Sequence, residues 1–407
     1  MSSSSPVTLA DVEAARERLD DEDIVRTTPV DTSRSLSGMA GADVRLKMEH
    51  LQRTGSFKTR GAYNRISQVG DDVDRVVAAS AGNHAQGVAL AATKVGIDAT
   101  VVMPTSAPQA KVDATRSYGA TVELHGRDFQ ETMAYARDLA DDDGRLFVHA
   151  FDDPDIVAGQ GTLGLEVEEQ VPDLDAVIVP VGGGGLIGGV ATALKGRDSD
   201  VRVVGVQAEH AATVPESLER GEPVTSDDPR TIADGIATGG LSALTFELIR
   251  RHVDEVVTVS DDEISRAILV LLERAKQLVE GAGAASVAAL LSGDVAADGE
   301  TVVPLLCGGN IDPSMLQTVL TYALTDRRQL LRLRVRIRDR PGRMGELATL
   351  LAEHGVNIRE VHHDRAVEDL EVGEAYLVFH VVTGGPEHAA SVIEAVEAAG
   401  YEVAQVN

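Results

Sequence analysis

Short apolar runs of strand length alternate with longer segments of helical pattern through residues 76–209 of this chain. The runs are rich in Val, Ala and Ile and show no polar alternation, which is typical of strands buried on both faces. Strands and helices in alternation predict βαβ units and a parallel sheet. The expected strands are residues 76–79, 99–103, 120–124, 146–150 and 177–181, and the expected helices are residues 110–118, 129–139 and 163–170.

A different pattern begins after residue 326. Residues 331–338 alternate apolar and basic side chains with period two, as a strand with one solvated face does. Upstream, Ser260 and Glu263 have the spacing of a capping box, which predicts a long helix that ends near Val279. After the alternating strand we expect a turn over residues 339–345, a helix over 346–354, strands over 357–361 and 374–383, a helix over 387–399 and a strand over 401–406.

Lys58 is the first candidate for chemistry. It is one of only six lysines in the chain, and it stands between Phe57 and a run of small and helix-initiating residues. A confined lysine can lose its proton and form a Schiff base with a carbonyl compound. The alternative is a solvated lysine near the start of a helix.

A glycine-rich segment follows the expected strand over residues 177–181. Glycines without Cβ atoms let backbone N–H groups converge on one anion, and the helix expected after them adds its positive N-terminal end. The segment lacks the Gly-Lys-Ser/Thr ending of a P-loop and matches the dinucleotide fingerprint only loosely, so a phosphate site and a flexible turn both remain open. Its residues are Gly182, Gly183, Gly184, Gly185 and Leu186.

Two further strands end in polar or reactive residues. Ser80 and Asn83 follow the strand over residues 76–79, at the end where parallel sheets bind ligands, although Ser80 could be a helix N-cap alone. Cys307, the only cysteine, follows an apolar run over residues 302–306. A lone buried cysteine is more often a small apolar side chain than a functional group.

These four segments, in this order, resemble the fold-type II pyridoxal-phosphate enzymes. The closest branch is the one that holds threonine dehydratases (threonine ammonia-lyases) together with serine dehydratases and serine racemases. The resemblance covers the whole chain and implies an α/β catalytic region over residues 1–326, with two open, mainly parallel sheet lobes, the smaller one near residues 48–148. The βαββαβ region over residues 330–407 resembles an ACT domain, a small-molecule sensor that pairs with a second copy. A ferredoxin-like module with a purely structural role is the alternative.

The resemblance also implies roles for individual residues. Lys58 would hold pyridoxal 5'-phosphate as a Schiff base and later act as general base, Phe57 would line the cofactor, Asn83 would bond its ring oxygen, and Cys307 would face its pyridine nitrogen. The residues from Gly182 to Leu186 would bind the phosphate. Substrate contacts would come from Ser80, Asn83 and His84.

Three residues bear on the choice of reaction. An uncharged partner such as Cys307 makes the cofactor a shallow electron sink, which suits β-elimination. Ala81 stands where serine racemases carry a proton-donating serine, and Phe151 stands where they carry an asparagine. We therefore expect conversion of L-threonine to 2-oxobutanoate and ammonia, the first step toward isoleucine, with L-serine as a slower substrate. The alternatives are a serine dehydratase or racemase, another β-replacement enzyme, and a non-catalytic amino-acid sensor.

For the ACT-like region we expect an amino-acid effector, such as isoleucine, and a homo-oligomer, either dimer or tetramer. The residues that match the family's effector loop are Asp339, Gly342, Gly345 and Asn357. His362 and His363 are adjacent on a strand and point to opposite faces, so we expect no metal site there. We also expect none at Glu209, because Pro215 replaces the second acidic residue of the family's metal site.

The composition narrows the class of partner. A formal net charge of −28 would repel nucleic acid and anionic lipid, and it is typical of proteins from salt-rich cytoplasm. One cysteine excludes an intramolecular disulfide framework and favours a reducing cytoplasm. No apolar run is long enough to cross a bilayer, and residues 1–6 lack the apolar segment of a signal peptide.

Overall fold

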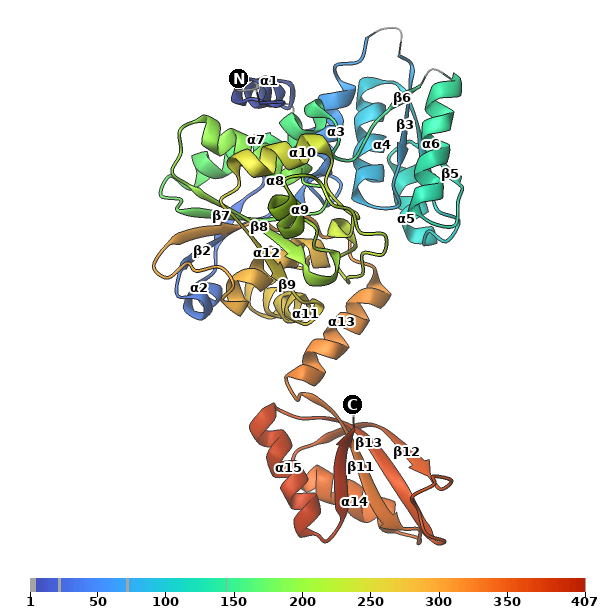
Figure 1. Ribbon diagram of the computed structural model, residues 1–407. Helices are drawn as coiled ribbons and strands as arrows, with labels where there is room; N and C mark the ends of the chain where they lie inside the picture. Colours follow the sequence, from blue (N-terminus) through green and yellow to red (C-terminus); the bar gives the residue numbers. More distant parts are fainter. Residues whose placement is uncertain (1–4, 21–22, 71–72, 144, 407) are drawn as a thin grey trace. The chain divides into compact units, whose positions relative to one another are not determined.

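The computed structural model describes residues 5–20, 23–70, 73–143 and 145–406, so residues 1–4 of the polar N-terminal segment lie outside the described residues. The chain divides into two compact units, Met1–Asp312 and Pro313–Asn407 (Figure 1). The division falls at the start of α13 (Pro313–Asp326), a helix that the sequence analysis grouped with the catalytic region.

A mainly parallel sheet forms the centre of the first unit. Its strands β2, β10, β7, β8 and β9 run parallel, and β1 pairs antiparallel with β2 at one edge. Every residue of β7 is buried, as its uninterrupted apolar sequence predicts. In spatial order the strands are β1 (Val30–Thr32), β2 (Asp43–Lys47), β10 (Thr301–Pro304), β7 (Ala176–Pro180), β8 (Arg202–Ala208) and β9 (Glu255–Val259).

The second sheet of this unit is wholly parallel and lies in the stretch expected to form the smaller lobe. Alternate residues of its strand β3 face two separate cores: Val76 and Ala78 pack with α4, whereas Val77 and Ala79 pack with α6. Helices therefore cover both faces of the sheet (Figure 1). The strands in order are β5 (Thr121–Leu124), β4 (Asp98–Met103), β3 (Arg75–Ala79) and β6 (Leu146–Phe147), with helices α4 (Asn83–Val95), α5 (Gln109–Ser117) and α6 (Phe129–Asp143).

Three helices of the first unit pack unusually closely. The helix α7 (Pro154–Gln170) contacts both α3 (Lys58–Ile66) and α8 (Gly185–Gly196). A Cβ added at Gly159 would lie 2.7 Å from the Cα of Gly61, and one at Gly189 would lie 2.3 Å from the carbonyl oxygen of Val157. Side chains at these positions would force the helices apart. The glycines thus fix α3, which begins at Lys58, and α8, which follows the glycine segment, on the same central helix.

The helix that begins at Ser260 ends earlier than the sequence predicts. Its capping box is present, but α11 (Asp261–Val270) widens into a π-helical turn, η4 (Leu271–Ala275), and Lys276 then adopts φ +59°. A left-handed residue stops the helix, so the expected end near Val279 is wrong. The remaining helices are α1 (Leu9–Arg18), α2 (Arg34–Ala40), η1 (Glu49–Leu51), η2 (Glu209–Ala211), α9 (Val214–Arg220), η3 (Asp234–Ile236), α10 (Ala243–His252) and α12 (Gly281–Ser292).

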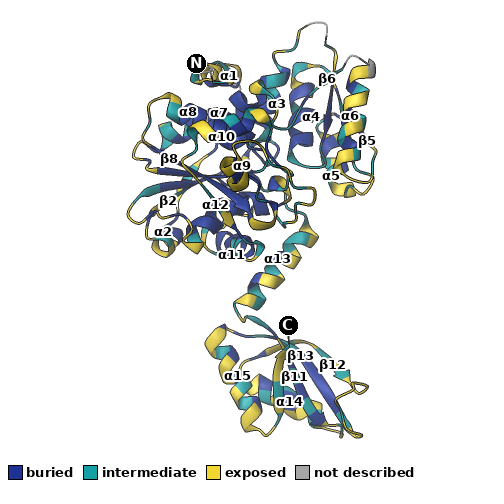
Figure 2. Cartoon of the chain, viewed as in Figure 1, coloured by how far each residue is buried: buried dark blue, intermediate teal, exposed yellow. Residues whose placement is uncertain are grey.

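The second unit has the expected βαββαβ order, with an antiparallel sheet of order β12-β13-β11-β14. The apolar residues of β11 face a core that includes residues of α14 and α15, and its arginines alternate with them, as the period-two pattern predicts. Most of the neighbouring strand β13 is buried (Figure 2). No helix among the described residues is long and apolar enough to span a membrane. The elements are β11 (Leu330–Arg338), α14 (Arg343–Glu353), β12 (Asn357–Asp364), β13 (Glu374–Val382), α15 (Pro386–Ala398) and β14 (Glu402–Val406).

Candidate functional site

Lys58 is the first residue of α3 and is half-buried. The ammonium nitrogen donates to the carbonyl oxygen of Ala150 at 3.3 Å and lies 5.0 Å from the centre of the Phe57 ring. Burial lowers the pKa of Lys58 to about 8, against the opposing effect of Cys307 and Glu280. With this pKa about a tenth of the amine is neutral at pH 7, against less than about one part in a thousand for an ordinary lysine, and the neutral form is the one that attacks a carbonyl carbon.

The segment after β10 brings Cys307 beside Lys58. The backbone N–H of Phe57 donates to the carbonyl oxygen of Cys307 at 3.2 Å, and Ser56 forms a backbone bridge with Gly308. The Cys307 side chain is buried, and burial raises the pKa of its thiol far above the ordinary value. The thiol thus stays uncharged, so it can exchange a hydrogen bond with a ligand without placing a negative charge on it.

The glycine segment forms a tight turn between β7 and α8. Gly184 has φ +85° and is the N-cap of α8, a conformation that costs little only for glycine. A Cβ at Gly183 would lie 2.2 Å from the ring of Phe151. The first turn of α8 leaves backbone N–H groups without intrahelical partners, and its positive end favours an anion. Because Phe151 follows Ala150, one short segment touches both the glycine turn and the amine of Lys58.

A chain of amide and carboxyl groups runs behind Lys58. Asn83, the first residue of α4, donates from Nδ2 to Glu280 Oε1 at 2.7 Å, and Asn310 Nδ2 donates to Asn83 Oδ1 at 2.7 Å. Burial raises the pKa of Glu280 to about 7, although the bond from Asn83 opposes the rise. The sequence analysis missed Glu280 and Asn310 as site residues. A feature of the sequence that could have indicated them is their position next to glycines: Glu280 precedes Gly281, and Asn310 follows Gly309.

The other two predicted substrate contacts differ in how they are held. Ser80 Oγ accepts from the backbone N–H of Gly82 at 3.1 Å, so it shapes the turn that leads into α4. His84 is buried, and its Nε2 lies 3.0 Å from the carbonyl oxygen of Val148. Burial, reinforced by Lys58, lowers the pKa of His84 to about 3. The ring is neutral at physiological pH and already bonded to the backbone, so it can position α4.

These residues fit the pyridoxal phosphate that the sequence resemblance implies. The site offers a readily neutralised amine at Lys58, a glycine turn at a helix N-terminus for the phosphate, and an uncharged thiol. Ser56 Oγ is also buried, and it has no hydrogen-bond partner among the described residues. A buried hydroxyl without a partner is costly in a folded protein unless a ligand satisfies it.

The four predicted effector residues do not converge within one chain. Asp339 follows Arg338, which pairs with Glu374 at one end of β13, whereas Asn357 pairs with Val382 at the other end. Gly342, with φ +95°, caps α14, and Gly345 lies inside that helix near the Asp339 end of the sheet. The Asp339 carboxylate accepts from Arg365 Nε at 2.6 Å. Asn357 could complete a site with the turn only if it came from a second copy.

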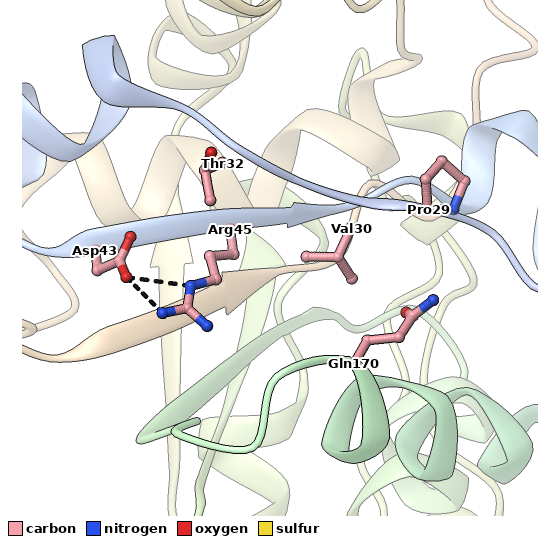
Figure 3. Close-up of a pocket in the computed structure, with 6 residues that line it drawn as sticks. All are labelled: Pro29, Val30, Thr32, Asp43, Arg45 and Gln170. Carbon is pink, nitrogen blue, oxygen red and sulfur yellow. Dashed lines mark hydrogen bonds and ion pairs between the residues drawn. The ribbon is translucent and has the colours of Figure 1, made fainter.

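A separate open pocket of roughly 540 Å³ lies at the edge of the large sheet (Figure 3). Its wall includes Arg45, which is held by Asp43 at 2.7 Å and by Asp173 at 2.6 Å. None of the predicted catalytic or cofactor-binding residues lines this pocket, so it is separate from the candidate active site. Its lining residues are Pro29, Val30, Thr32, Asp43, Arg45 and Gln170.

Comparison with known families gives two matches along the chain. A family model described as "Pyridoxal-phosphate dependent enzyme" matches residues 22–308, and one described as "ACT domain" matches residues 331–400. The helix α13 lies outside both.

Individual relatives carry related names. An L-threonine ammonia-lyase of Thermotoga maritima is 43% identical, over 98% of this chain and 99% of the relative. A catabolic L-threonine dehydratase of Escherichia coli is 44% identical, over 78% of this chain and 97% of its own length. The solved structure of the processed form of threonine deaminase isoform 2 from Solanum lycopersicum has a TM-score of 0.73 and 38% identity, and the match covers 77% of this chain and 87% of that one.

Proposed function

Since the chain belongs to the pyridoxal-phosphate-dependent enzymes and, within them, to the family of the L-threonine ammonia-lyases, we propose that it converts L-threonine to 2-oxobutanoate and ammonia. The observation that carries this proposal is the convergence of the Lys58 amine and the glycine turn after β7, because the segment of Ala150 and Phe151 contacts both. A second support is the family relationship over almost the whole chain.

Each site residue has a proposed task. Lys58 would hold the cofactor through its amine, and the same amine, when neutral and free, would take the proton from the substrate Cα. The backbone N–H groups of the segment from Gly182 to Leu186 bind the phosphate, and Asn83 bonds the ring oxygen. When bound, the cofactor supplies an electron sink next to the substrate Cα. Because the Cys307 thiol is uncharged, it would not hold a proton on the pyridine nitrogen of the cofactor, and the cofactor would withdraw electrons less strongly. A weaker electron sink favours elimination of the β-hydroxyl over a long-lived carbanion.

Glu280 is a further member of this proposed site. Its carboxyl accepts the hydrogen bond from Asn83 Nδ2, and this bond fixes which way the Asn83 amide faces. Asn83 Oδ1 accepts from Asn310, so both ends of the amide are oriented. Phe57 closes the site beside the Lys58 amine.

For the substrate carboxylate we propose Ser80 and the N-terminal turn of α4 as the binding groups, because a helix N-terminus attracts an anion. His84 keeps its bond to the Val148 carbonyl oxygen and contributes by holding that turn in place. The methyl and hydroxyl groups of threonine would then lie toward Phe151, whose ring packs over Gly183.

The test is a product assay on L-threonine and L-serine with the pyridoxal phosphate-loaded enzyme. We expect 2-oxobutanoate from L-threonine at the higher rate, pyruvate from L-serine at a lower rate, and neither product from Lys58→Ala. Lys276→Ala is the matched control, because Lys276 lies on the surface and its side chain donates only to the Glu273 carbonyl oxygen among the bonds described. A Lys58→Ala enzyme with the wild-type rate would refute the proposal.

The same assay separates the deaminase from a racemase. Ala81 cannot donate a proton, so D-serine should form much more slowly than pyruvate, and Ala81→Ser should increase D-serine formation. Equal rates of racemisation and deamination in the wild-type enzyme would show that Ala81 does not discriminate. Absence of turnover with every amino acid, together with amino-acid binding, would instead favour a sensor.

We further propose that the second unit regulates the enzyme within a homo-oligomer. An amino acid such as isoleucine would bind between two copies, with the turn from Asp339 to Gly345 of one and Asn357 of the other. The Escherichia coli relative is matched over 97% of its own length but only 78% of this chain, so a threonine dehydratase can be shorter than this chain by about the size of the second unit. Isoleucine should lower threonine affinity in the full chain and have no effect after truncation at Asp326. Hyperbolic kinetics unchanged by isoleucine would leave the unit a structural role.

We also propose a cellular location and a metabolic role for the enzyme. We place the enzyme in the cytoplasm, where its single thiol stays reduced. If isoleucine inhibits it, the role is biosynthetic, because an end product then limits its own supply. Insensitivity to isoleucine would favour a catabolic role.

A further inference from the structure

The outer face of the second unit's sheet carries a cluster of two histidines and one glutamate. Val361 and Phe379 face the core of the unit, so Glu360 and His362 on β12 and His380 on β13 lie on the opposite, outer face. Glu360 and His380 are direct register partners. A bulge between Ile358 and Glu360 shifts the register, and this shift sets Glu360 and His362 on the same side as His380.

The potential ligand atoms of these side chains already converge. Glu360 Oε1 lies 3.1 Å from His362 Nε2, and Glu360 Oε2 lies 3.8 Å from His380 Nδ1. One ligand atom from each of the three residues lies within 4.8 Å of the others. Two atoms that each lie about 2.0–2.1 Å from a tetrahedral Zn²⁺ are roughly 3.3 Å apart. These two separations lie on either side of this value and the two imidazole nitrogens lie no more than 4.8 Å apart, so side-chain rotations would have to bring the three atoms to tetrahedral spacing.

The donor set indicates which cations would bind. Imidazole nitrogen suits Zn²⁺, Co²⁺, Ni²⁺ and Cu²⁺, whereas Mg²⁺ and Ca²⁺ prefer oxygen ligands. Glu360 and His362 are exposed and His380 is half-buried, so a fourth coordination position would face water. Arg332 is the register partner of His380 on β11, and its charge opposes a cation. We therefore expect the metal ion to dissociate from the protein with a constant in about the micromolar range. An ion bound this weakly exchanges with the solution, unlike a structural metal ion.

We infer that Glu360, His362 and His380 form a binding site for one divalent first-row transition-metal ion on the outer face of this sheet. The sequence analysis expected no metal here because His362 and His363 point to opposite faces. That expectation about the pair agrees with the structure, where His363 Nε2 lies 3.4 Å from Asp339 Oδ1 on the other side. The third ligand, His380, comes from another strand, and its pairing could not be read from the spacing of histidines.

The experiment is a titration of the full-length, cofactor-loaded protein with Zn²⁺ by calorimetry, after removal of free pyridoxal phosphate. Excess Mg²⁺ is present throughout to saturate sites made only of carboxylates on this acidic chain. We expect one Zn²⁺ per chain, and His362→Gln and His380→Gln should each weaken binding by at least about tenfold. His363→Gln, the neighbour on the opposite face, is the matched control and should leave the affinity unchanged.

A Co²⁺ difference spectrum provides the second readout. Visible d–d bands that appear with the wild-type protein and with His363→Gln, but not with His362→Gln, would support coordination by this cluster. Thermal unfolding of each variant checks that its second unit is folded, and exposed His362 gives the informative variant if His380→Gln is unstable. Absence of Zn²⁺ binding to the wild type, or equal affinity in the wild type and His362→Gln, would overturn the inference.

Discussion

Two titratable side chains in the site, Lys58 and Glu280, have pKa values closer to 7 than usual, because that of the lysine is lowered and that of the glutamate is raised. Burial lowers the pKa of Lys58 to about 8 and raises that of Glu280 to about 7. In both cases the charged form is disfavoured because it loses water. Lys58 could be found from its sequence motif. Glu280 could not be found in this way, because its role depends on the contact of residue 280 with Asn83 and Gly308, which only the folded chain creates.

The pKa of Lys58 predicts how fast the enzyme recovers its cofactor. Only the neutral amine attacks the aldehyde, so the rate of reconstitution from cofactor-free enzyme should rise with pH and level off above about 8. An ordinary lysine side chain would give a midpoint near about 10.4. The measurement is the growth of visible absorbance after mixing with pyridoxal phosphate at a series of pH values. A midpoint near that of free lysine would contradict the burial of this amine.

Glu280 predicts a pH-dependent difference in stability. Its pKa is higher in the folded enzyme than in the unfolded chain, so the folded state holds the extra proton between about pH 4.5 and pH 7. The free energy of unfolding of the cofactor-free enzyme should therefore fall, as pH rises through this window, by about 1–3 kcal/mol more than that of Glu280→Gln. The amide oxygen of the substituted side chain would still accept from Asn83, but an amide cannot titrate. Denaturant unfolding of both proteins at several pH values measures the difference, and parallel curves would contradict the shifted pKa.

At the scale of elements, the sequence predicted most of the fold and left out the parts that depend on close packing. The α/β class, the pyridoxal-phosphate family and the ACT domain are confirmed. The strand expected over residues 146–150 has only two residues in the sheet, and α7 begins at Pro154, well before the predicted start. In α7 the glycines obscure the helical pattern, because they serve contacts with α3 and α8. Such contacts between distant segments leave no periodic signal.

A buried ion network joins four elements around the start of α3. Arg60 donates from Nε to Glu49 at 2.8 Å and from Nη1 to Glu166 at 2.6 Å, and Lys47 Nζ donates to Glu166 at 2.7 Å. Arg60, Lys47 and Glu49 are at most 1% exposed. Burial would raise the pKa of Glu49, but Arg60, Lys47 and the hydroxyl of Thr28 together outweigh it, and the pKa lies below its ordinary value. The network links β2, η1 and α7 to the helix that carries Lys58.

Removal of Arg60 should therefore be costly. Arg60→Ala leaves the buried carboxylate of Glu49 without its main partner and removes one of the two cations that pair with half-buried Glu166, so we expect the free energy of unfolding to fall by about 3–5 kcal/mol. Arg16→Ala is the matched control: Arg16 pairs with Glu169 on the surface, where an ion pair contributes about 0–1 kcal/mol. Urea unfolding of the three proteins gives the comparison. Equal losses in the two variants would show that the buried network does not stabilise the fold.

For the molecule as a whole, net charge is the dominant feature. With −28 charges at pH 7 the folded chain repels itself, and salt weakens this repulsion because the Debye length falls from about 10 Å at 0.1 M to about 3 Å at 1 M. We expect stability and activity to increase up to molar KCl and to be lost on dialysis into dilute buffer. The measurement is the thermal midpoint and the threonine-deaminating rate against KCl concentration. Full activity after prolonged dialysis would contradict a halophilic enzyme.

Lys58, and none of the other five lysines, is expected to hold the cofactor and to act on the substrate. The most direct test of this expectation is reduction of the cofactor-loaded enzyme with borohydride, followed by proteolysis and mass spectrometry of the peptides. Reduction turns the Schiff base into a stable bond, so the pyridoxyl label marks the lysine that held the cofactor. We expect the label on the peptide that contains Lys58 alone. A label on a peptide with Lys47, Lys111 or another lysine, or no label on a protein that deaminates threonine, would contradict this expectation.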